Sequence, residues 1–385
     1  MISGVDGPGG EPMTANRFGR WGLALAAAGA AVLAGQAPRN AKQGPKAMDI
    51  TPYKLEDEAF WARPTRGSDR LATRLVGQYA GVLVDAPRRV PVDQRTTLPA
   101  GIYYMGPVRE LAMVPFERFG VITAMDVTHN RLYAVAGHAL QRDSDPVPGP
   151  PPDPSKLSAK ANMSDTKSVD LRELLRVPWE PARWLFMALL RDRVSNRAEI
   201  ELVRSPASFV DPEVEKYREA ERAKVNAGFI FPRPGGTLAG YKRQPESPAV
   251  PEQPGIALSP ARLVDQDRET RWMVYGAFRL APLVEETVKP GWQDPYYALR
   301  TADPKPVAVV GVTLLLTGAN DGSLYLYPLR VPAFTRAGAE VTGYFALDLR
   351  QMEGAPRRAQ TYFVYAFAGE QMAGPAPSAL VPRKE

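Results

Sequence analysis

Residues 170–203 read DLRELLRVPWEPARWLFMALLRDRVSNRAEIELV, and residues 348–381 read DLRQMEGAPRRAQTYFVYAFAGEQMAGPAPSALV. The two stretches align without a gap at an offset of 178 residues. Each begins with Asp-Leu-Arg, continues through a proline and contains a run of aromatic and aliphatic residues, with Trp184 aligned to Tyr362. The shared pattern indicates two copies of one structural module.

Segments upstream of each stretch match as well. VITAMDVTHNRLYAVAGHAL starts at Val121 and VVGVTLLLTGANDGSLYLYPLRV starts at Val309, and both read as strand, polar turn, strand. The turn Asn320-Asp321-Gly322 is a hairpin signal, because Asn, Asp and Gly tolerate a positive φ. Further upstream, LVGQYAGVLV at Leu75 resembles MVYGAFRLAPLV at Met273, which extends the repeat toward the start of each copy.

Short strands separated by frequent turns are typical of sandwiches of two packed sheets. We therefore predict a mainly β chain with two tandem, internally repeated β-sandwich modules of immunoglobulin- or fibronectin-like type, at residues 71–205 and 269–385. A small barrel is the alternative. Residues 184–190 and 361–369 have the composition of central strands that are packed on both faces.

The first copy carries a proline-rich insertion at residues 145–156, DPVPGPPPDPSK, which the second copy lacks. Such a sequence favours an exposed polyproline II conformation. It is either a passive surface loop or an arm whose Pro150, Pro151 and Pro152 bind an aromatic groove on a partner protein.

The segment between the copies, residues 206–268, predicts one helix and a linker. Residues 211–225 have an N-cap candidate in Asp211 and a proline at the first helical position, Pro212. Residues 233–260 are rich in Pro, Gly and Gln and predict a linker or wrapping loop. Residues 38–70 form an N-terminal extension of unassigned structure.

Residues 1–37 have the pattern of a leader, with a secretory signal at 13–34. Arg17 and Arg20 precede the uncharged run WGLALAAAGAAVLA, whose last residues, Val32-Leu33-Ala34, are the small or short residues that a signal peptidase needs. The alternative is a membrane anchor, but 14 helical residues span only about 21 Å, less than the ~30 Å hydrocarbon core. We expect cleavage, no transmembrane span afterwards, and export to the periplasm, the outer surface or the medium.

Composition excludes several classes of site. The 385 residues include 39 prolines, 2 histidines and no cysteine, so disulfides, thiolate zinc sites, iron–sulfur clusters and cysteine nucleophiles are excluded. The net charge of +6 is not gathered into a basic block, so we expect no nucleic-acid partner. We predict no cofactor and no metal site.

No set of catalytic residues stands out. His129 falls at a predicted hairpin turn and His138 near the far end of the next strand, too far apart to share a metal. Asp126 is interpreted as an outward-facing strand residue. Carboxylates could serve a glycosidase only if two faced each other across a cleft between the modules.

Aromatic residues near predicted turns of the second copy suggest a sugar-binding surface, because exposed rings stack on pyranoses. The alternative is that Trp272 and Tyr275 begin a strand and fill the core. The candidate binding residues are Trp272, Tyr275, Trp292, Tyr296 and Tyr297.

The preferred hypothesis is an exported, non-catalytic binding or accessory protein of the bacterial envelope or secreted space. It would act on another protein through loops at the ends of the sandwiches, where such folds carry recognition. A carbohydrate-binding protein is the first alternative, with polysaccharide as its ligand. A carboxylate-dependent glycoside hydrolase is the second.

Overall fold

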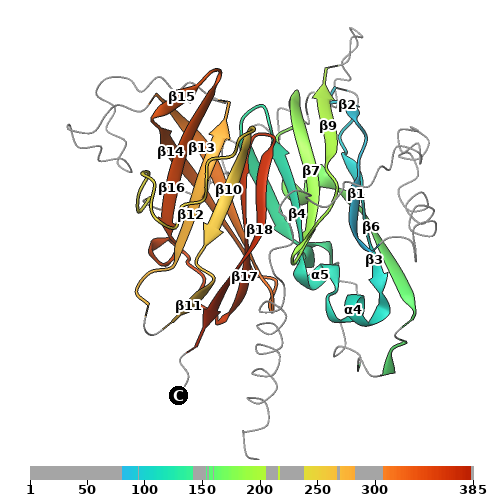
Figure 1. The fold of residues 1–385 in the computed structure, drawn as a ribbon. Coiled ribbons are helices and arrows are strands. Elements are labelled where there is room, and N and C mark those ends of the chain that lie inside the picture. The colour runs from blue at the N-terminus through green and yellow to red at the C-terminus, as the bar shows by residue number, and fades with distance from the viewer. Residues whose placement is uncertain are drawn as a thin grey trace, which may run out of the picture. The chain divides into compact units, whose positions relative to one another are not determined.

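The computed structural model describes residues 80–93, 95–141, 153, 156–158, 160–204, 216, 238–266, 269–281 and 307–382 (Figure 1). The described strands form four sheets. The predicted fold class is confirmed: the chain is mainly β and contains two tandem, internally repeated β-sandwich modules. We call the strands between residues 81 and 203 module 1, and those between 255 and 381 module 2.

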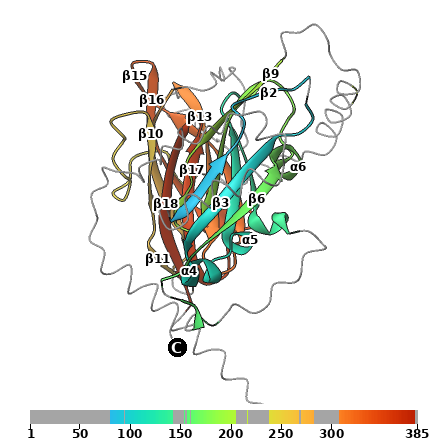
Figure 2. The ribbon, with the colours of Figure 1, turned by 90° about the vertical axis from the view of Figure 1, so that its right-hand side faces the viewer.

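Module 1 has a smaller sheet of order β1-β3-β6 and a larger sheet of order β2-β9-β7-β4-β5, with β8 paired to β7. Figure 2 shows β3 and β6 side by side. The strands are β1 Gly81–Asp85, β2 Arg89–Pro91, β3 Pro99–Pro107, β4 Gly120–Asp126, β5 Arg131–Ala136, β6 Asn162–Asp170, β7 Ala182–Leu190, β8 Arg193–Val194 and β9 Ala198–Val203. The helices are α4 Val108–Met113, α5 Phe116–Phe119, α6 Leu171–Leu175 and the 3-10 helix η2 Gly137–Leu140.

Module 2 has a smaller sheet of order β10-β12-β16-β15 and a larger sheet of order β11-β18-β17-β13-β14. Its strands are β10 Gly255–Pro260, β11 Leu263–Asp265, β12 Met273–Leu280, β13 Ala308–Gly318, β14 Leu324–Ala333, β15 Thr335–Ala337, β16 Glu340–Asp348, β17 Gln360–Ala368 and β18 Gln371–Val381. A 3-10 helix, η4 Leu349–Gln351, follows β16.

Apart from β15, which has no counterpart among the described strands of module 1, the two modules share their strand order and register. β7 pairs with β9 through Ala182 and Leu202, and β17 pairs with β18 through Gln360 and Leu380, each 178 residues further on. Both larger sheets also end in a short parallel pair, β2 with β9 and β11 with β18. The structure therefore aligns residues 170–203 with 348–381 as the sequence does.

Asp170 and Asp348 form the same corner in the two modules. Oδ1 of Asp170 accepts hydrogen bonds from the backbone N–H groups of Leu98 and Arg172, at 2.9 and 3.0 Å. Oδ1 of Asp348 accepts the two equivalent bonds, at 2.9 and 3.1 Å. The carboxylate thus ties the end of one strand to the chain entering its neighbour and caps the helical turn that follows. This geometry explains why both copies have an aspartate at this position.

Each sandwich encloses a core of aliphatic and aromatic side chains. The aligned residues Trp184 and Tyr362 occupy the same place in the two cores. Trp184 packs on Tyr133 with ring centroids 5.4 Å apart, and Tyr362 packs on Tyr325 at 6.1 Å. The repeat is therefore preserved in the packing as well as in the backbone.

A third apolar cluster joins the two modules. It combines side chains from β4 and β7 of module 1 with side chains from β13 and β17 of module 2, so the larger sheets pack against each other. This arrangement explains the apolar runs of residues 184–190 and 361–369, which are buried on both faces. Its buried members are Val121, Met125, Leu185, Met187, Leu189, Leu315, Tyr365 and Phe367.

The β4–β5 and β13–β14 hairpins each contact the opposite module. In the first, the side chain of Asn130 donates to the carbonyl of Gly311 at 3.0 Å and accepts from the N–H of Gly369 at 2.8 Å. In the second, Gly322 has a φ of +66°, and a Cβ there would lie 1.8 Å from the carbonyl oxygen of Arg118. The predicted turn at residues 320–322 is confirmed, and it serves the junction between the modules.

Two sequence-based interpretations are wrong in part. Residues 206–268 were expected to contain only a helix and a linker, yet β10 and β11 lie there and belong to the sheets of module 2. The prolines misled the interpretation, because β10 is an edge strand, where proline is tolerated. The structure also aligns β12 with β3 rather than with Leu75, since Met273 pairs with Asp348 as Pro99 pairs with Asp170.

The barrel alternative is wrong, because the described strands form separate sheets that pack in pairs. The predicted leader, extension and insertion lie outside the described residues, apart from Asp153 and Lys156 of the insertion. The predicted helix at residues 211–225 also lies outside them, apart from Lys216. None of the described helices is long and apolar enough to cross a membrane.

Candidate functional site

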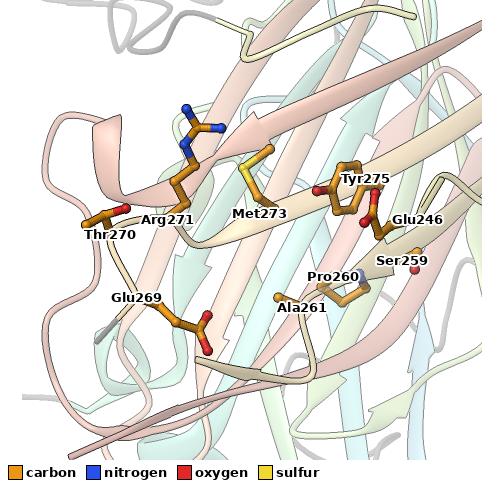
Figure 3. A pocket seen from close by; sticks show the side chains of 9 residues that line it. All are labelled: Glu246, Ser259, Pro260, Ala261, Glu269, Thr270, Arg271, Met273 and Tyr275. Atoms are coloured by element: carbon orange, nitrogen blue, oxygen red, sulfur yellow. The ribbon is translucent and has the colours of Figure 1, made fainter. Parts of the chain in front are cut away.

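An open groove of about 490 Å³ lies on module 2 (Figure 3). It sits at the start of β12, beside the end of β10, on the sheet face that points away from the module core. The lining residues are Glu246, Ser259, Pro260, Ala261, Glu269, Thr270, Arg271, Met273 and Tyr275.

The alternation of side chains along β12 determines which residues form the floor of the groove. Successive side chains of β12 point to opposite faces, so Val274 enters the core while Met273 and Tyr275 face outward. β10 pairs antiparallel with β12 and places Ser259 directly opposite Tyr275. The floor is therefore an aromatic ring with aliphatic and thioether surface around it.

The segment from Leu238 to Pro254 brings a carboxylate to this face. The backbone of Gly240 bridges to Ala346 of β16, and further along the carbonyl of Pro251 accepts a hydrogen bond from Nε of Arg279 at 2.8 Å. Between these two attachments lies Glu246. Residues 238–254 are thus tied to two strands of the sheet and position one rim of the groove.

The rim carries charges of both signs. Figure 3 shows Glu246 beside Tyr275 at one end of the groove and Glu269 at the other, with Arg271 on the segment that leads into β12 at Met273. Burial raises the pKa of Tyr275, and the charge of Glu246 adds to that effect while Arg271 opposes it. The phenol therefore stays protonated at neutral pH and can both donate and accept a hydrogen bond.

The structure separates the two aromatic residues that were expected to bind sugars together. The sugar-binding hypothesis is wrong for Trp272. Its side chain is fully buried, and its Nε1–H donates to Oγ of Ser378 at 2.8 Å. Tyr275, three residues later, lines the groove. The other candidates, Trp292, Tyr296, Tyr297, Pro150, Pro151 and Pro152, lie outside the described residues.

The sequence contains little that would have identified the remaining groove residues. Glu246 and the segment Ser259–Ala261 fall in the stretch interpreted as a linker, and Glu269 to Arg271 precede a strand without any motif. The one usable signal was Tyr275 on an alternating strand.

A second polar cluster lies in module 1, between α5 and β6. The ammonium of Lys167 is 2.6 Å from Glu117 and 3.2 Å from Asp165, and the hydroxyl of Tyr104 donates to Asp165 at 2.6 Å. Burial, followed by the bond to Asp165, raises the pKa of Tyr104 well above its usual range, so this donor keeps its proton. Each carboxylate already has a cation or hydroxyl partner, and the cluster closes the edge of the sandwich.

The histidines do not form a shared site. Nδ1 of His129 is 2.7 Å from Asp126, whereas His138 lies in η2. Asp126 is buried and also accepts from the N–H of His129 at 3.0 Å, so its interpretation as an outward-facing residue is wrong and it caps the hairpin. Among the described residues, no group of three His, Cys, Asp or Glu side chains could hold a metal ion.

The glycoside hydrolase hypothesis required an acidic cleft between the modules. In the described part of the chain, the surfaces of the larger sheets that meet there are apolar and form the third cluster. The two glutamates of the groove, Glu246 and Glu269, instead lie on one module.

Comparison with known proteins gives no family. No protein-family model matches the chain, and no curated protein sequence matches it. Among solved structures, it matches the interferon gamma receptor alpha chain of chicken, with 10% identity over 77% of this chain and 96% of that chain and a TM-score of 0.17. An adhesin of Mobiluncus mulieris matches with 9% identity over 74% and 80% and a TM-score of 0.12. At these scores the likeness supports no argument about function.

Proposed function

We propose that this chain is an exported, non-catalytic binding protein, an accessory or structural subunit for another protein of the bacterial envelope or secreted space. The groove of module 2 is the surface that binds this partner. The observation that carries the proposal is the combination, in one groove, of an apolar floor around Tyr275 with carboxylates and a guanidinium on the rim.

The composition of the groove suits a protein partner. Tyr, Met and Arg are enriched in protein interfaces, and Tyr and Arg often supply most of the binding energy. Met273 offers a flexible apolar surface, whereas Tyr275 presents a ring with a hydroxyl that retains its proton. The exposed charges of Glu246, Glu269 and Arg271 would orient a partner and exclude like-charged ones.

The strand that carries Tyr275 is held in place on both sides, which favours binding of a partner without rearrangement of the groove. β12 is paired on both sides, with β10 and with β16, and its inner face is packed in the module core. A binding surface held in this way loses little conformational entropy when a partner binds. Export rests on the signal pattern at residues 13–34.

Site-specific photocrosslinking in the native host tests the proposal. A photoreactive residue at Thr270, on the rim of the groove, should give a discrete covalent adduct with one envelope or secreted protein. The control is Leu263, which is 63% exposed on the same module and lies outside the groove. Tyr275→Ala should reduce the Thr270 adduct at least tenfold while the melting temperature stays within about 2 °C, because Tyr275 is only half-buried.

Two results would contradict the proposal. The first is equal adduct formation from Thr270 and Leu263, which would indicate nonspecific contact. The second is an adduct at Thr270 that survives Tyr275→Ala unchanged, because the ring would then contribute nothing to recognition.

Polysaccharide binding is the second candidate, and Tyr275 is the observation that favours it. Its ring is accessible in a groove whose carboxylates could accept hydrogen bonds from sugar hydroxyls. A glycan array separates the two candidates: retention of a polysaccharide by the full chain, abolished by Tyr275→Ala, would favour this function. If the full chain retained no glycan on the array, polysaccharide binding would be excluded.

A further inference from the structure

Arg191 has a backbone conformation that arginine adopts at a cost. It lies in the turn after β7 with a φ of 55°, in the left-handed region. The equivalent position in module 2, 178 residues further on, is Gly369, with a φ of 54°. Glycine adopts this conformation freely, whereas a residue with a Cβ pays about 1–2 kcal/mol. The two copies thus share one turn, and only the first carries a large cationic side chain there.

The guanidinium of Arg191 lacks the partner that a half-buried cation normally has. It stacks on the ring of Phe119, with Cζ 4.5 Å from the ring centroid. Its Nε is buried and makes no hydrogen bond, and no carboxylate of the described residues lies within ion-pair distance. Burial lowers the pKa of Arg191, and neighbouring Arg118 lowers it further, against the opposing charges of Asp192 and Glu110.

A second guanidinium contacts the same ring. Cζ of Arg118 lies 5.0 Å from the centroid of Phe119, and its side chain makes one weak hydrogen bond, 3.4 Å, to the carbonyl of Asn320. Two like charges therefore share one aromatic ring at the junction of the modules. The hydroxyl of Tyr365 donates to the carbonyl of Arg191, so module 2 also helps to fix the turn.

Unlike Arg191, the neighbouring Arg193 has an ion-pair partner among the described residues. Arg193 forms an ion pair with Glu110, so its charge is already balanced. It lies two residues from Arg191 and therefore provides a matched control for the loss of one positive charge.

We propose that Arg118 and Arg191 form an oxyanion-binding site at the junction of the two modules, for a carboxylate or a phosphate group. Guanidinium groups bind both oxyanions through paired N–H donors, and partial burial strengthens such bonds. A bound oxyanion would satisfy the orphaned donor of Arg191 and remove the repulsion between the two cations. The backbone strain at Arg191 is then offset by the ligand, consistent with the clustering of strained residues at binding sites. The site is separate from the groove and does not depend on the proposed function.

Calorimetric titration of the full chain tests the site with two probes, inorganic phosphate and N-acetylglutamate, each at an ionic strength matched with sodium chloride. The wild type should bind at least one probe. Arg191→Gly, which installs the residue of the second copy, and Arg118→Gln should each weaken binding at least tenfold. Arg193→Gln should stay within twofold of the wild type.

Thermal unfolding without ligand separates binding from a purely structural role. Arg191→Gly relieves the strained turn, so its midpoint should equal or exceed that of the wild type. Binding of phosphate alone would support a phosphoryl ligand, and binding of N-acetylglutamate alone an acidic side chain. Absence of binding to either probe would overturn the proposal, as would an equal loss of binding in Arg193→Gln.

Discussion

Buried polar groups in this chain fall into two kinds. The indole of Trp272 donates to Ser378, whose hydroxyl in turn donates to the carbonyl of Ala261, so both of these donors are satisfied. Asp85, at the end of β1, is the opposite: its carboxyl is buried and Oδ2 has no hydrogen-bond partner. Satisfied groups cost little to bury, whereas an orphaned carboxylate is expensive and favours the neutral acid.

Asp85→Asn should remove a pH dependence of stability. Burial raises the pKa of Asp85 from 3.8 to about 8, against the backbone hydrogen bond from Ala86, which lowers it. The folded state therefore holds the proton more tightly than the unfolded state, and this contribution to stability is lost as the pH rises from about 4 to about 8, with a slope of at most about 1.4 kcal/mol per pH unit. The asparagine variant should have the higher melting temperature at pH 8.5 and a similar one at pH 4.

The measurement is thermal unfolding of both proteins across this pH range. Other groups titrate equally in the two, so only the difference between the curves matters. Parallel curves would show that Asp85 is ionised in the folded state.

At the scale of strands, the sequence predicts best where the repeat is strongest. The hairpin at residues 320–322 and the two-sided burial of residues 361–369 follow from turn chemistry and apolar composition, and both are found in the structure. β10 was missed, because prolines and glycines flank it and its strand character depends on pairing with β12, which a local pattern does not show.

The groove was the part that the sequence could predict least. Only Tyr275 was anticipated among its nine lining residues, and it was paired with Trp272, which faces the core. Two residues three apart on a strand face opposite sides, and which of the two enters the core depends on a register that the sequence alone does not fix. Glu246 reaches the groove through attachments of residues 238–254 that lie far apart in sequence.

Any side chain at Gly322, in the β13–β14 turn, should lower the free energy of unfolding. An alanine there meets both the left-handed backbone and the carbonyl of Arg118, whereas Gly338 has the same φ of +66° and open space around it. Gly338→Ala should cost about 1 kcal/mol. Gly322→Ala should cost about 2 kcal/mol more, because the turn must move away from module 1.

Chemical denaturation of the two variants measures this difference. Equal losses of unfolding free energy would show that the hairpin does not press on module 1.

At the scale of the molecule, side chains of the third apolar cluster should stabilise both modules, whereas side chains in the core of one module should stabilise mainly that module. Leu314 and Leu315 are adjacent on β13 and both fully buried, but Leu314 faces the core of module 2 and Leu315 faces module 1. Substitution by alanine should cost about 2–5 kcal/mol at either position. Only Leu315→Ala should also increase amide hydrogen exchange in β4 and β7, because it loosens the face that supports them.

Hydrogen exchange by mass spectrometry distinguishes the pair, since Leu314→Ala provides a control of equal size one residue away. If both variants increased exchange in module 1 alike, the modules would be coupled through more than this cluster.

The burial of the larger sheets on both faces also limits how the two copies could diverge after duplication. A change in side-chain size on the shared face of one copy must be accommodated by the other copy. We therefore expect the residues on these faces to be substituted slowly and in matched pairs. Within the residues that the structure describes, the outer faces of the smaller sheets do not pack against the other module, so a change there needs no matching change in the other copy. One of these sheets carries the groove, and the other carries the buried Asp85. In this architecture, the outer faces of the smaller sheets are the places where one copy can change without a matching change in the other.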